Sequence, residues 1–352
     1  MRHVGLGQAR LGKVLAVILV ALAAVWVPSA GGQETVTLTY ASYGGALKDA
    51  EVKAFIEPYM KLHPNIKVLY DIIDRAKLIA MVESNNVTWD VADVGNDFGL
   101  KAHEKYLEKI DCSVVPCADL QPDKYPTTGY RVAWSVSGVG LGYNTTKMPA
   151  GQTPQSWADF FDLQKFPGKR SSMNDVSSFV LEVALVADGV PAGKVYPLDI
   201  QRGLRKWDAI KSEVKFTDNF QGCAEAVATG DAVMGLCWTG RFATMRKNGA
   251  PVAIQWNGTT LNGGYFAMPT GSKPVKEAMQ FIAYMVSPQP CALISEYIPY
   301  GCPNVKAAAY VKDSVKPNLG TSHAATAIFI NDVYWDQHRD ELFKTWQAWL
   351  TK

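Results

Sequence analysis

Residues 35–73 alternate between strand patterns and a helical pattern, and this alternation constrains the fold more than any other feature. The segment 35–45, "TVTLTYASYGG", is rich in threonine, valine and tyrosine and ends in paired glycines, as a strand and its turn do. Residues 46–63 place their large apolar side chains on one helical face, and 65–73 return to a strand pattern. A strand, a helix and a strand in this order predict the start of a parallel sheet.

The alternation continues along the chain and predicts an α/β protein with two lobes. Residues 76–84 have a helical pattern and 89–94 read as a buried strand, and the same alternation resumes over 156–256. Two extended, glycine-containing stretches, 133–144 and 263–269, interrupt it. We interpret them as strands that cross between lobes, since 352 residues suit two domains.

Residues 1–32 have the pattern of a secretory signal peptide. Three basic residues precede the apolar run 14–27, which is short for a membrane span, and Pro28 and small residues follow. A membrane anchor is the alternative. Removal of this segment lowers the formal charge from +2 to −1, because it contains three basic and no acidic residues. The mature chain is therefore expected to be exported and soluble, and its charge argues against a nucleic-acid partner.

All six cysteines follow the signal segment, and an even number in an exported chain favours disulfides. Six cysteines allow 15 connectivities, but their grouping in three local pairs favours bonds between neighbours. Zinc is the competing interpretation, and the absence of CxxC spacing and of a nearby histidine argues against it. The predicted bonds are Cys112–Cys117, Cys223–Cys237 and Cys291–Cys302.

Signatures of catalysis and of cofactor binding are weak. No GxSxG is present, and "HEKYL" at 103–107 lacks the second histidine of a zinc protease. "GVGLG" at 138–142 resembles half of a dinucleotide loop, but its third glycine is misplaced and a strand crossing explains it. We therefore expect a protein that is not an enzyme and holds no cofactor or metal; a secreted hydrolase is the disfavoured alternative.

Three loops at predicted strand ends are candidates for a binding site. Tyr43 follows the first strand, Asp97 follows the strand over 89–94, and "GLCWTGRF" places Trp238 and Arg241 after the apolar run 232–237. Ligands of open α/β sheets bind at the carboxyl ends of strands. We interpret the Trp238 cluster as the wall of a site. Core packing is the alternative interpretation.

Seven short motifs, taken in order, resemble the substrate-binding proteins of ABC importers, in particular the spermidine/putrescine-binding family. They are "YASYGG", "TWDVADVG", "GLGYN", "PQSWADFFDLQKFPGKR", "GDAVMGLCWTGR", "YFAMP" and "IPYGCPN". The similarity covers nearly all of the mature chain. It implies the type II-like periplasmic binding protein fold, in which a ligand cleft lies between two α/β lobes joined by crossing strands, and delivery of the ligand to a permease.

The family sandwiches a polyamine between aromatic rings and pairs its ammonium groups with carboxylates. Carried over by motif, the resemblance implies ligand contacts from Tyr43, Asp175, Trp238, Tyr265 and Tyr300.

Two departures from the family pattern leave the ligand open. An aromatic residue and an acid are usual where this chain has "NGG" at 262–264, and Asp97 stands where an aromatic is usual and would compensate. Arg241 adds a cation beside Trp238. It would support Asp97 or Asp175, or bind a ligand carboxylate.

The sequence thus predicts a monomeric periplasmic protein that captures a polyamine such as spermidine or putrescine for an inner-membrane ABC permease. The alternative ligand is a zwitterionic amino-acid-like or opine-like solute whose carboxylate binds Arg241. One lobe is predicted to comprise residues 33–138 and 263–305, and the other 139–262 and 306–352.

Overall fold

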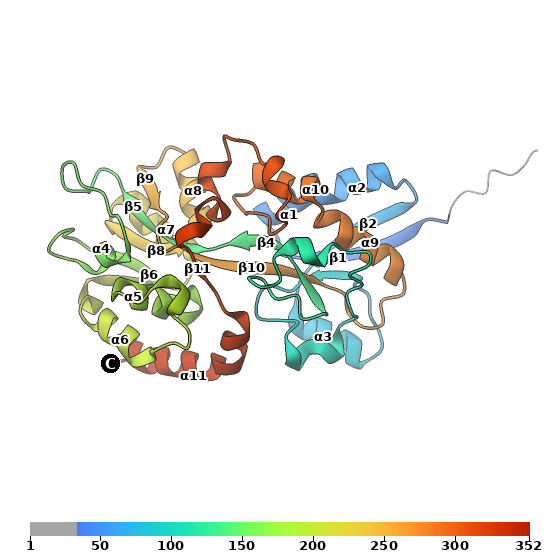
Figure 1. The fold of residues 1–352 in the computed structure, drawn as a ribbon, viewed down its shortest axis with the longest axis horizontal. Coiled ribbons are helices and arrows are strands. Elements are labelled where there is room, and N and C mark those ends of the chain that lie inside the picture. Colours follow the sequence, from blue (N-terminus) through green and yellow to red (C-terminus); the bar gives the residue numbers. More distant parts are fainter. Residues whose placement is uncertain (1–33) are drawn as a thin grey trace, which may run out of the picture. The chain divides into compact units, whose positions relative to one another are not determined.

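The computed structural model describes residues 34–352, and the predicted signal segment 1–32 lies outside the described residues. Two sheets organise this part of the chain (Figure 1). The six-stranded sheet has the order β11-β10-β3-β1-β2, with β4 paired to β10, and the five-stranded sheet has the order β7-β6-β8-β5-β9. The α/β fold class predicted from the alternation is confirmed.

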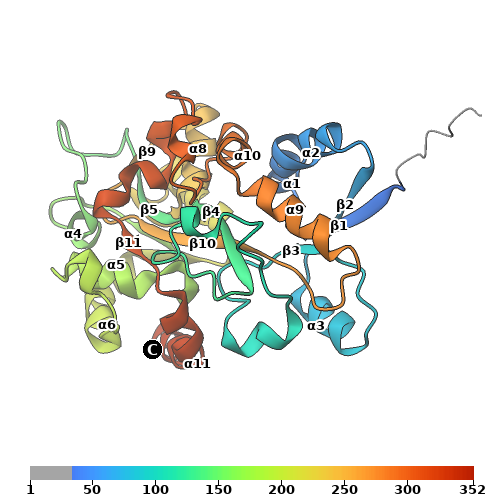
Figure 2. The same ribbon diagram turned by 45° about the vertical axis from the view of Figure 1, so that its right-hand side comes forward.

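The strands of the six-stranded sheet are β1 (Val36–Ser42), β2 (Ile66–Ile72), β3 (Val91–Asp93), β4 (Arg131–Ser137), β10 (Thr260–Ala267) and β11 (Ile328–Phe329). Strands β1, β2 and β3 are parallel, as the first strand–helix–strand unit predicts, whereas β10 is antiparallel to β3 and β4. Helices α1 (Ala46–Glu51), α2 (Glu57–Leu62) and α9 (Val275–Met285) cover one face, and α3 (Arg75–Glu83) covers the other (Figure 2).

The strands of the five-stranded sheet are β5 (Val139–Asn144), β6 (Arg170–Met173), β7 (Val214–Thr217), β8 (Met234–Trp238) and β9 (Val252–Gln255). On one face pack α4 (Trp157–Phe161), α5 (Val180–Ala187), α6 (Ile200–Asp208) and the terminal helix α11 (Asp332–Leu350). On the other pack α7 (Phe220–Thr229) and α8 (Thr239–Lys247), and α10 (Pro288–Leu293) lies near α9 and the π-helical turn Val52–Ile56. Each sheet is therefore buried between helical layers, which agrees with its apolar strands.

Side-chain caps begin several of these helices. Asp74 accepts from the amide of Lys77 at the start of α3 (3.0 Å), and Asn219 accepts from Gly222 at the start of α7 (2.7 Å). Each cap satisfies a donor that the first helical turn leaves free. Gly230 follows the last residue of α7, and its φ of 82° is left-handed. Glycine adopts this conformation readily, and it commonly ends helices in this way.

Chain crossings join the two sheets. Strand β4 belongs to the six-stranded sheet and β5 to the five-stranded one, and the single residue Gly138 separates them. A Cβ at Gly138 would lie 1.7 Å from the carbonyl oxygen of Thr260, so this crossing requires glycine. The hydroxyl of Thr260, the first residue of β10, accepts from the amide of Val139 (2.9 Å). This bond connects the start of β10 to the crossing at Gly138.

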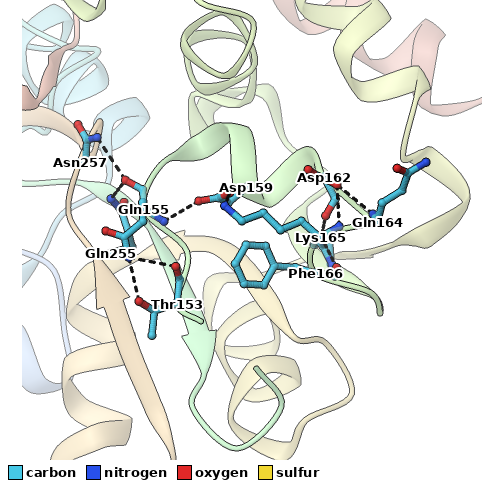
Figure 3. Close-up of polar contacts among 10 residues, drawn as sticks. Thr153, Gln155, Asp159, Asp162, Gln164, Lys165, Phe166, Gln255 and Asn257 are labelled. Atoms are coloured by element: carbon cyan, nitrogen blue, oxygen red, sulfur yellow. Dashed lines mark hydrogen bonds and ion pairs between the residues drawn. The ribbon is translucent and has the colours of Figure 1, made fainter. Parts of the chain in front are cut away.

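The motif "PQSWADFFDLQKFPGKR" contains α4 and a polar network around it, and its Gln155 carbonyl accepts from the side chains of Gln255 and Asn257 (Figure 3). The Asp159 carboxylate accepts from the amide of Gln155 and from Nζ of Lys165, both at 2.6 Å. Asp162 accepts from the amides of Gln164 and Lys165 (Figure 3). These hydrogen bonds hold the segments on either side of α4.

The three predicted disulfides are confirmed. Cys112–Cys117 closes a surface loop, Cys223–Cys237 joins α7 to β8, and Cys291–Cys302 joins α10 to the segment after Tyr300. Among the residues that the structure describes, no helix is both long enough and apolar enough to span a bilayer.

Candidate functional site

A cleft of about 210 Å³ lies where the carboxyl ends of strands from both sheets meet. Its residues come from the start of α3, the loop after β3, β10, the turns after β6 and β7, the end of β8 and the first turns of α11. They are Arg75, Asn96, Asp97, Ser177, Phe179, Phe220, Trp238, Asn262, Asp332, Trp335, Asp336 and Arg339. Ligands of α/β sheets bind at such carboxyl ends.

A larger surface hollow of about 570 Å³ lies between α6 and α11, around Leu204, Lys344 and Trp349. It lies away from the strand ends, and side chains of α6 and α11 and the terminal Lys352 form it. We therefore take the smaller cleft as the candidate site, because strand ends and loops converge there.

An ion triad occupies one wall of the cleft. Arg75 Nη1 lies 2.6 Å from Asp97 Oδ1, and Arg339 Nη1 of α11 lies 3.2 Å from Asp97 Oδ2. Arg75 also donates to the Tyr43 hydroxyl through Nη2 (3.2 Å). Burial alone would lower the pKa of Arg75, but the carboxylate of Asp97 and the hydroxyl of Tyr43 outweigh it and raise that pKa.

Gly95 allows this wall to pack closely. Its φ is +68°, and a Cβ there would lie 2.8 Å from Nη2 of Arg75 and 3.1 Å from the Tyr43 hydroxyl. The glycine of "GNDF" therefore serves both the left-handed turn and the approach of the arginine.

Two aromatic pairs also line the cleft. The rings of Phe220 and Trp238 meet edge to face at 5.3 Å, and those of Phe179 and Trp335 do so at 5.7 Å. The indole of Trp335 donates to Oε1 of the fully buried Glu182 (2.8 Å), which fixes that ring. Ring faces and edges of this kind contact both methylene groups and cations.

A buried polar network supports the floor of the cleft. Asp332 accepts from Arg131 Nη2 (3.0 Å) and from the Tyr265 hydroxyl (2.7 Å), and its Oδ1 accepts from the Asn96 amide (3.3 Å). The Arg131 guanidinium also lies over the Tyr265 ring, 3.7 Å from its centroid. The network connects β4 and β10 of one sheet to the first residue of α11.

Asn262 lines the cleft and carries a buried acceptor that lacks a hydrogen-bond partner within residues 34–352. This acceptor is its Oδ1, and the side chain is 7 % exposed. A buried amide oxygen without a donor is costly.

Of the residues predicted from the sequence, Asp97 and Trp238 line the cleft, and Tyr43 reaches its edge through Arg75. Tyr265 lies beneath the cleft, fully buried, and its hydroxyl binds Asp332. Tyr300 lies near Gly240 at the start of α8, and burial raises its pKa to about 12.

The other two predicted residues lie outside the cleft lining. Asp175 accepts from the amide of Ser177 (2.8 Å) and so caps the short turn Val176–Ser178. Arg241 is exposed on α8, and it forms no ion pair within the described part of the chain. The ligand roles of all seven residues stay predictions.

Sequence reasoning missed Arg75, Arg339 and the rings other than Trp238. Arg75 could have been found, because it opens a helix directly after a strand, as the other site loops do. Arg339 lies in the terminal helix, far from any predicted strand end, and no local pattern marks it.

The sequence profile of the bacterial extracellular solute-binding proteins matches residues 54–321. The chain belongs to this family. It is the substrate-binding protein of an ABC transporter, and its relatives are binding proteins rather than enzymes. The family binds small ligands and delivers them to an ABC permease, which agrees with a cleft between two sheets.

Individual relatives bind different ligands. The chain is 31% identical over 334 residues to the gamma-aminobutyric acid-binding protein of Pseudomonas aeruginosa, which covers 92% of this chain and 94% of that protein. It is 32% identical over 284 residues to the putrescine-binding periplasmic protein of Escherichia coli, covering 72% and 76%. A solved GABA receptor structure is 34% identical with a TM-score of 0.79, covering 90% of this chain and 98% of that one.

Proposed function

We propose that the cleft binds a small zwitterion, an amino-acid-like solute of the 4-aminobutyrate kind, and that the protein presents it to its permease. The observation that carries this proposal is the ion triad: Asp97 is already neutralised by Arg75 and Arg339. A polycation needs carboxylates that are free to pair with it, and this cleft presents guanidinium groups as well.

Charge and polarity in the cleft suit a ligand with two unlike ends. Arg75 and Arg339 offer guanidinium groups to a carboxylate, which can replace Asp97 on one of them. Asp336 and Asn262 also line the cleft and carry oxygen acceptors that suit an ammonium group. The gamma-aminobutyric acid-binding protein of Pseudomonas aeruginosa supports this assignment, because it is similar over 92% of the chain.

Arg241 is the second candidate for the carboxylate anchor. It lies less than one helical turn after Trp238, exposed and without an ion pair in the described chain, so its guanidinium is available. Binding that depends on Arg241 would place the carboxylate at the α8 side of the cleft.

The polyamine assignment, including spermidine and putrescine, stays a prediction. It is supported by the Escherichia coli relative and by the aromatic pairs of the cleft, whose rings suit methylene chains and cations. The predicted lobe boundaries also stay a prediction; scattering profiles that change on ligand addition would support a hinge between them.

Calorimetric titration of 4-aminobutyrate, putrescine and spermidine tests the ligand class. We expect 4-aminobutyrate to bind. Trp238→Ala should weaken binding of any of these ligands, since the ring contacts methylenes and ammonium alike. Loss of a buried carboxylate partner costs about 2 to 5 kcal/mol, so comparing Arg75→Gln, Arg339→Gln and Arg241→Ala should identify the anchor.

Arg202→Ala is the matched control, because Arg202 of α6 pairs with Asp188 at the surface and does not line the cleft. It should leave every affinity unchanged. Binding of putrescine or spermidine, with no binding of 4-aminobutyrate, would refute the zwitterion assignment.

A further inference from the structure

Glu51 is a fully buried carboxyl group with no cation against it. It is the last residue of α1, and a π-helical turn, Val52–Ile56, follows it directly. Its Oε1 accepts from the hydroxyls of Tyr40 (2.6 Å) and Ser42 (3.0 Å), and its Oε2 lies 2.8 Å from the Tyr70 hydroxyl. Within residues 34–352, Glu51 forms no ion pair.

The hydrogens of this cluster can be counted. The Tyr70 hydroxyl has one hydrogen and lies within hydrogen-bond distance of two acceptors, the backbone carbonyl of Tyr43 and Oε2 of Glu51. A carbonyl can only accept, so Tyr70 satisfies both contacts when it donates to Tyr43 and accepts from a protonated Glu51. An ionised Glu51 would compete with the Tyr43 carbonyl for the same hydrogen.

A second buried acid makes the neutral form of Glu51 the favourable one. Asp93 lies across the Ser42 hydroxyl, 3.5 Å from it, and accepts from the amide of Gly95 (3.2 Å). Burial, and then the charge of Asp93, raise the pKa of Glu51 to about 8, and burial raises the pKa of Asp93 to about 6. The other titratable and charged groups around the pair are Tyr40, Tyr43, Lys48, Tyr70, Arg75 and Tyr300.

The Tyr43 carbonyl belongs to a loop that contacts the ion triad through Arg75. We call residues 43–45 the Tyr43 loop; it follows β1, and its tyrosine hydroxyl accepts from Arg75, which pairs with Asp97 in the cleft. Tyr70 holds this loop by donating to the Tyr43 carbonyl. The protonation state of Glu51 determines whether the Tyr70 hydroxyl donates to that carbonyl or to Oε2 of Glu51. A chain of contacts therefore runs from a buried acid to the cleft wall.

We propose that neutral Glu51 is a positioning residue for the ligand cleft: through Tyr70 it holds the Tyr43 carbonyl, and its ionisation releases the Tyr43 loop and weakens ligand binding. The inference rests on the cleft of the proposed function but needs no particular ligand. The proposal predicts that ligand affinity falls at alkaline pH because the Glu51 carboxyl ionises, although Glu51 does not itself line the cleft.

Glu51→Gln separates this role from general effects of pH. A glutamine amide donates to Tyr70 as the protonated acid does, and its oxygen still accepts from Tyr40 and Ser42. Calorimetry with 4-aminobutyrate from about pH 6 to about pH 9.5 should show the wild-type Kd rising by up to about tenfold per pH unit above about pH 8. Glu51→Gln should keep the affinity measured near pH 7 and lose this rise, because both proteins share every other titrating group.

Two tyrosine variants act as a matched pair. Tyr70→Phe removes the donor to Tyr43, so binding should weaken at every pH and the Glu51-dependent rise should disappear. Tyr40→Phe removes only a donor to Oε1, so the alkaline rise should remain and move to higher pH. The same pH profile in wild type and Glu51→Gln, or a loss of affinity near pH 7 in Glu51→Gln, would overturn the proposal.

Hydrogen–deuterium exchange of the peptide covering residues 43–49, in which the Asp49 amide donates to the Gly45 carbonyl (3.3 Å), keeps the test independent of the ligand. After correction for intrinsic rates, its protection should fall with pH in wild type and stay constant in Glu51→Gln. If 4-aminobutyrate does not bind, the ligand assignment fails and this exchange still decides the role of Glu51. Equal loss of protection in both proteins would overturn it.

Discussion

Replacing Asp332 with alanine removes the carboxylate that neutralises a fully buried arginine. Arg131 is 0% exposed and Asp332 is 2% exposed. The arginine also donates to the carbonyls of Asn96 (2.7 Å) and Phe98 (2.8 Å), but those bonds leave its charge uncompensated. The Tyr265 hydroxyl would lose its acceptor in the same change.

The expected loss is about 4 kcal/mol of unfolding free energy. Breaking a buried ion pair by removing one partner costs about 3 to 5 kcal/mol, because the remaining charge stays desolvated. The orphaned hydroxyl of Tyr265 adds about 1 kcal/mol or more, and relaxation or entry of water offsets part of the sum. For a chain of this size the unfolding entropy is about 0.7 kcal/mol/K, so Tm should fall by about 6 °C.

Guanidinium unfolding and calorimetry of wild type and Asp332→Ala measure this loss directly. Asp188→Ala is the control, since Asp188 and Arg202 form a surface pair in which each side chain is more than a third exposed. That pair should contribute less than about 1 kcal/mol. If Asp332→Ala destabilises the protein no more than Asp188→Ala does, the argument from burial is wrong.

Two further predictions concern Glu51 and the disulfides. At about pH 7 Glu51→Gln should raise the unfolding free energy by about 3 kcal/mol, because the wild-type folded state keeps a carboxyl neutral up to about pH 8 while the unfolded chain ionises it above about pH 4.5. Urea titrations near pH 7 and near pH 4 measure this gain, which should vanish at the lower pH; an equal gain at both would contradict it. Replacing Cys223 and Cys237 by alanine should cost about 3 kcal/mol and weaken ligand binding, because the cleft tryptophan follows Cys237 directly. Replacing Cys112 and Cys117 should cost about 2 kcal/mol and leave the affinity unchanged, as paired denaturation and binding titrations would show.

The helices and strands could be predicted because local signals specify them. Periodicity marks the apolar faces, capping residues such as Asp74 and Asn219 begin helices, and glycines end them. The three disulfides could also be predicted from the sequence, since their partners are 5, 14 and 11 residues apart. Local spacing sufficed to choose among the possible connectivities.

Only some residues of the site could be predicted from the sequence. Asp97 and Trp238 were found because each follows a recognisable strand, and the carboxyl ends of such strands meet. Tyr265 shares a motif with the resembling family, yet whether its ring faces a ligand or the core depends on what packs above it. In this structure Asp332 and Arg131 do so, and the tyrosine is buried.

Local sequence patterns predicted the α/β class with two lobes, the first strand–helix–strand unit and the disulfide pairs, and the ordered motifs predicted the family. The tertiary structure alone decided which charges meet: Arg131 and Asp332 are 201 residues apart, and Arg339 reaches Asp97 only because α11 returns to the cleft after the last crossing. Electrostatic and hydrogen-bond energies depend on distance in space and on burial, and neither quantity is encoded in local spacing. For the same reason the neutral state of Glu51 follows from its surroundings, four hydroxyl and carboxyl groups contributed by three separate strands.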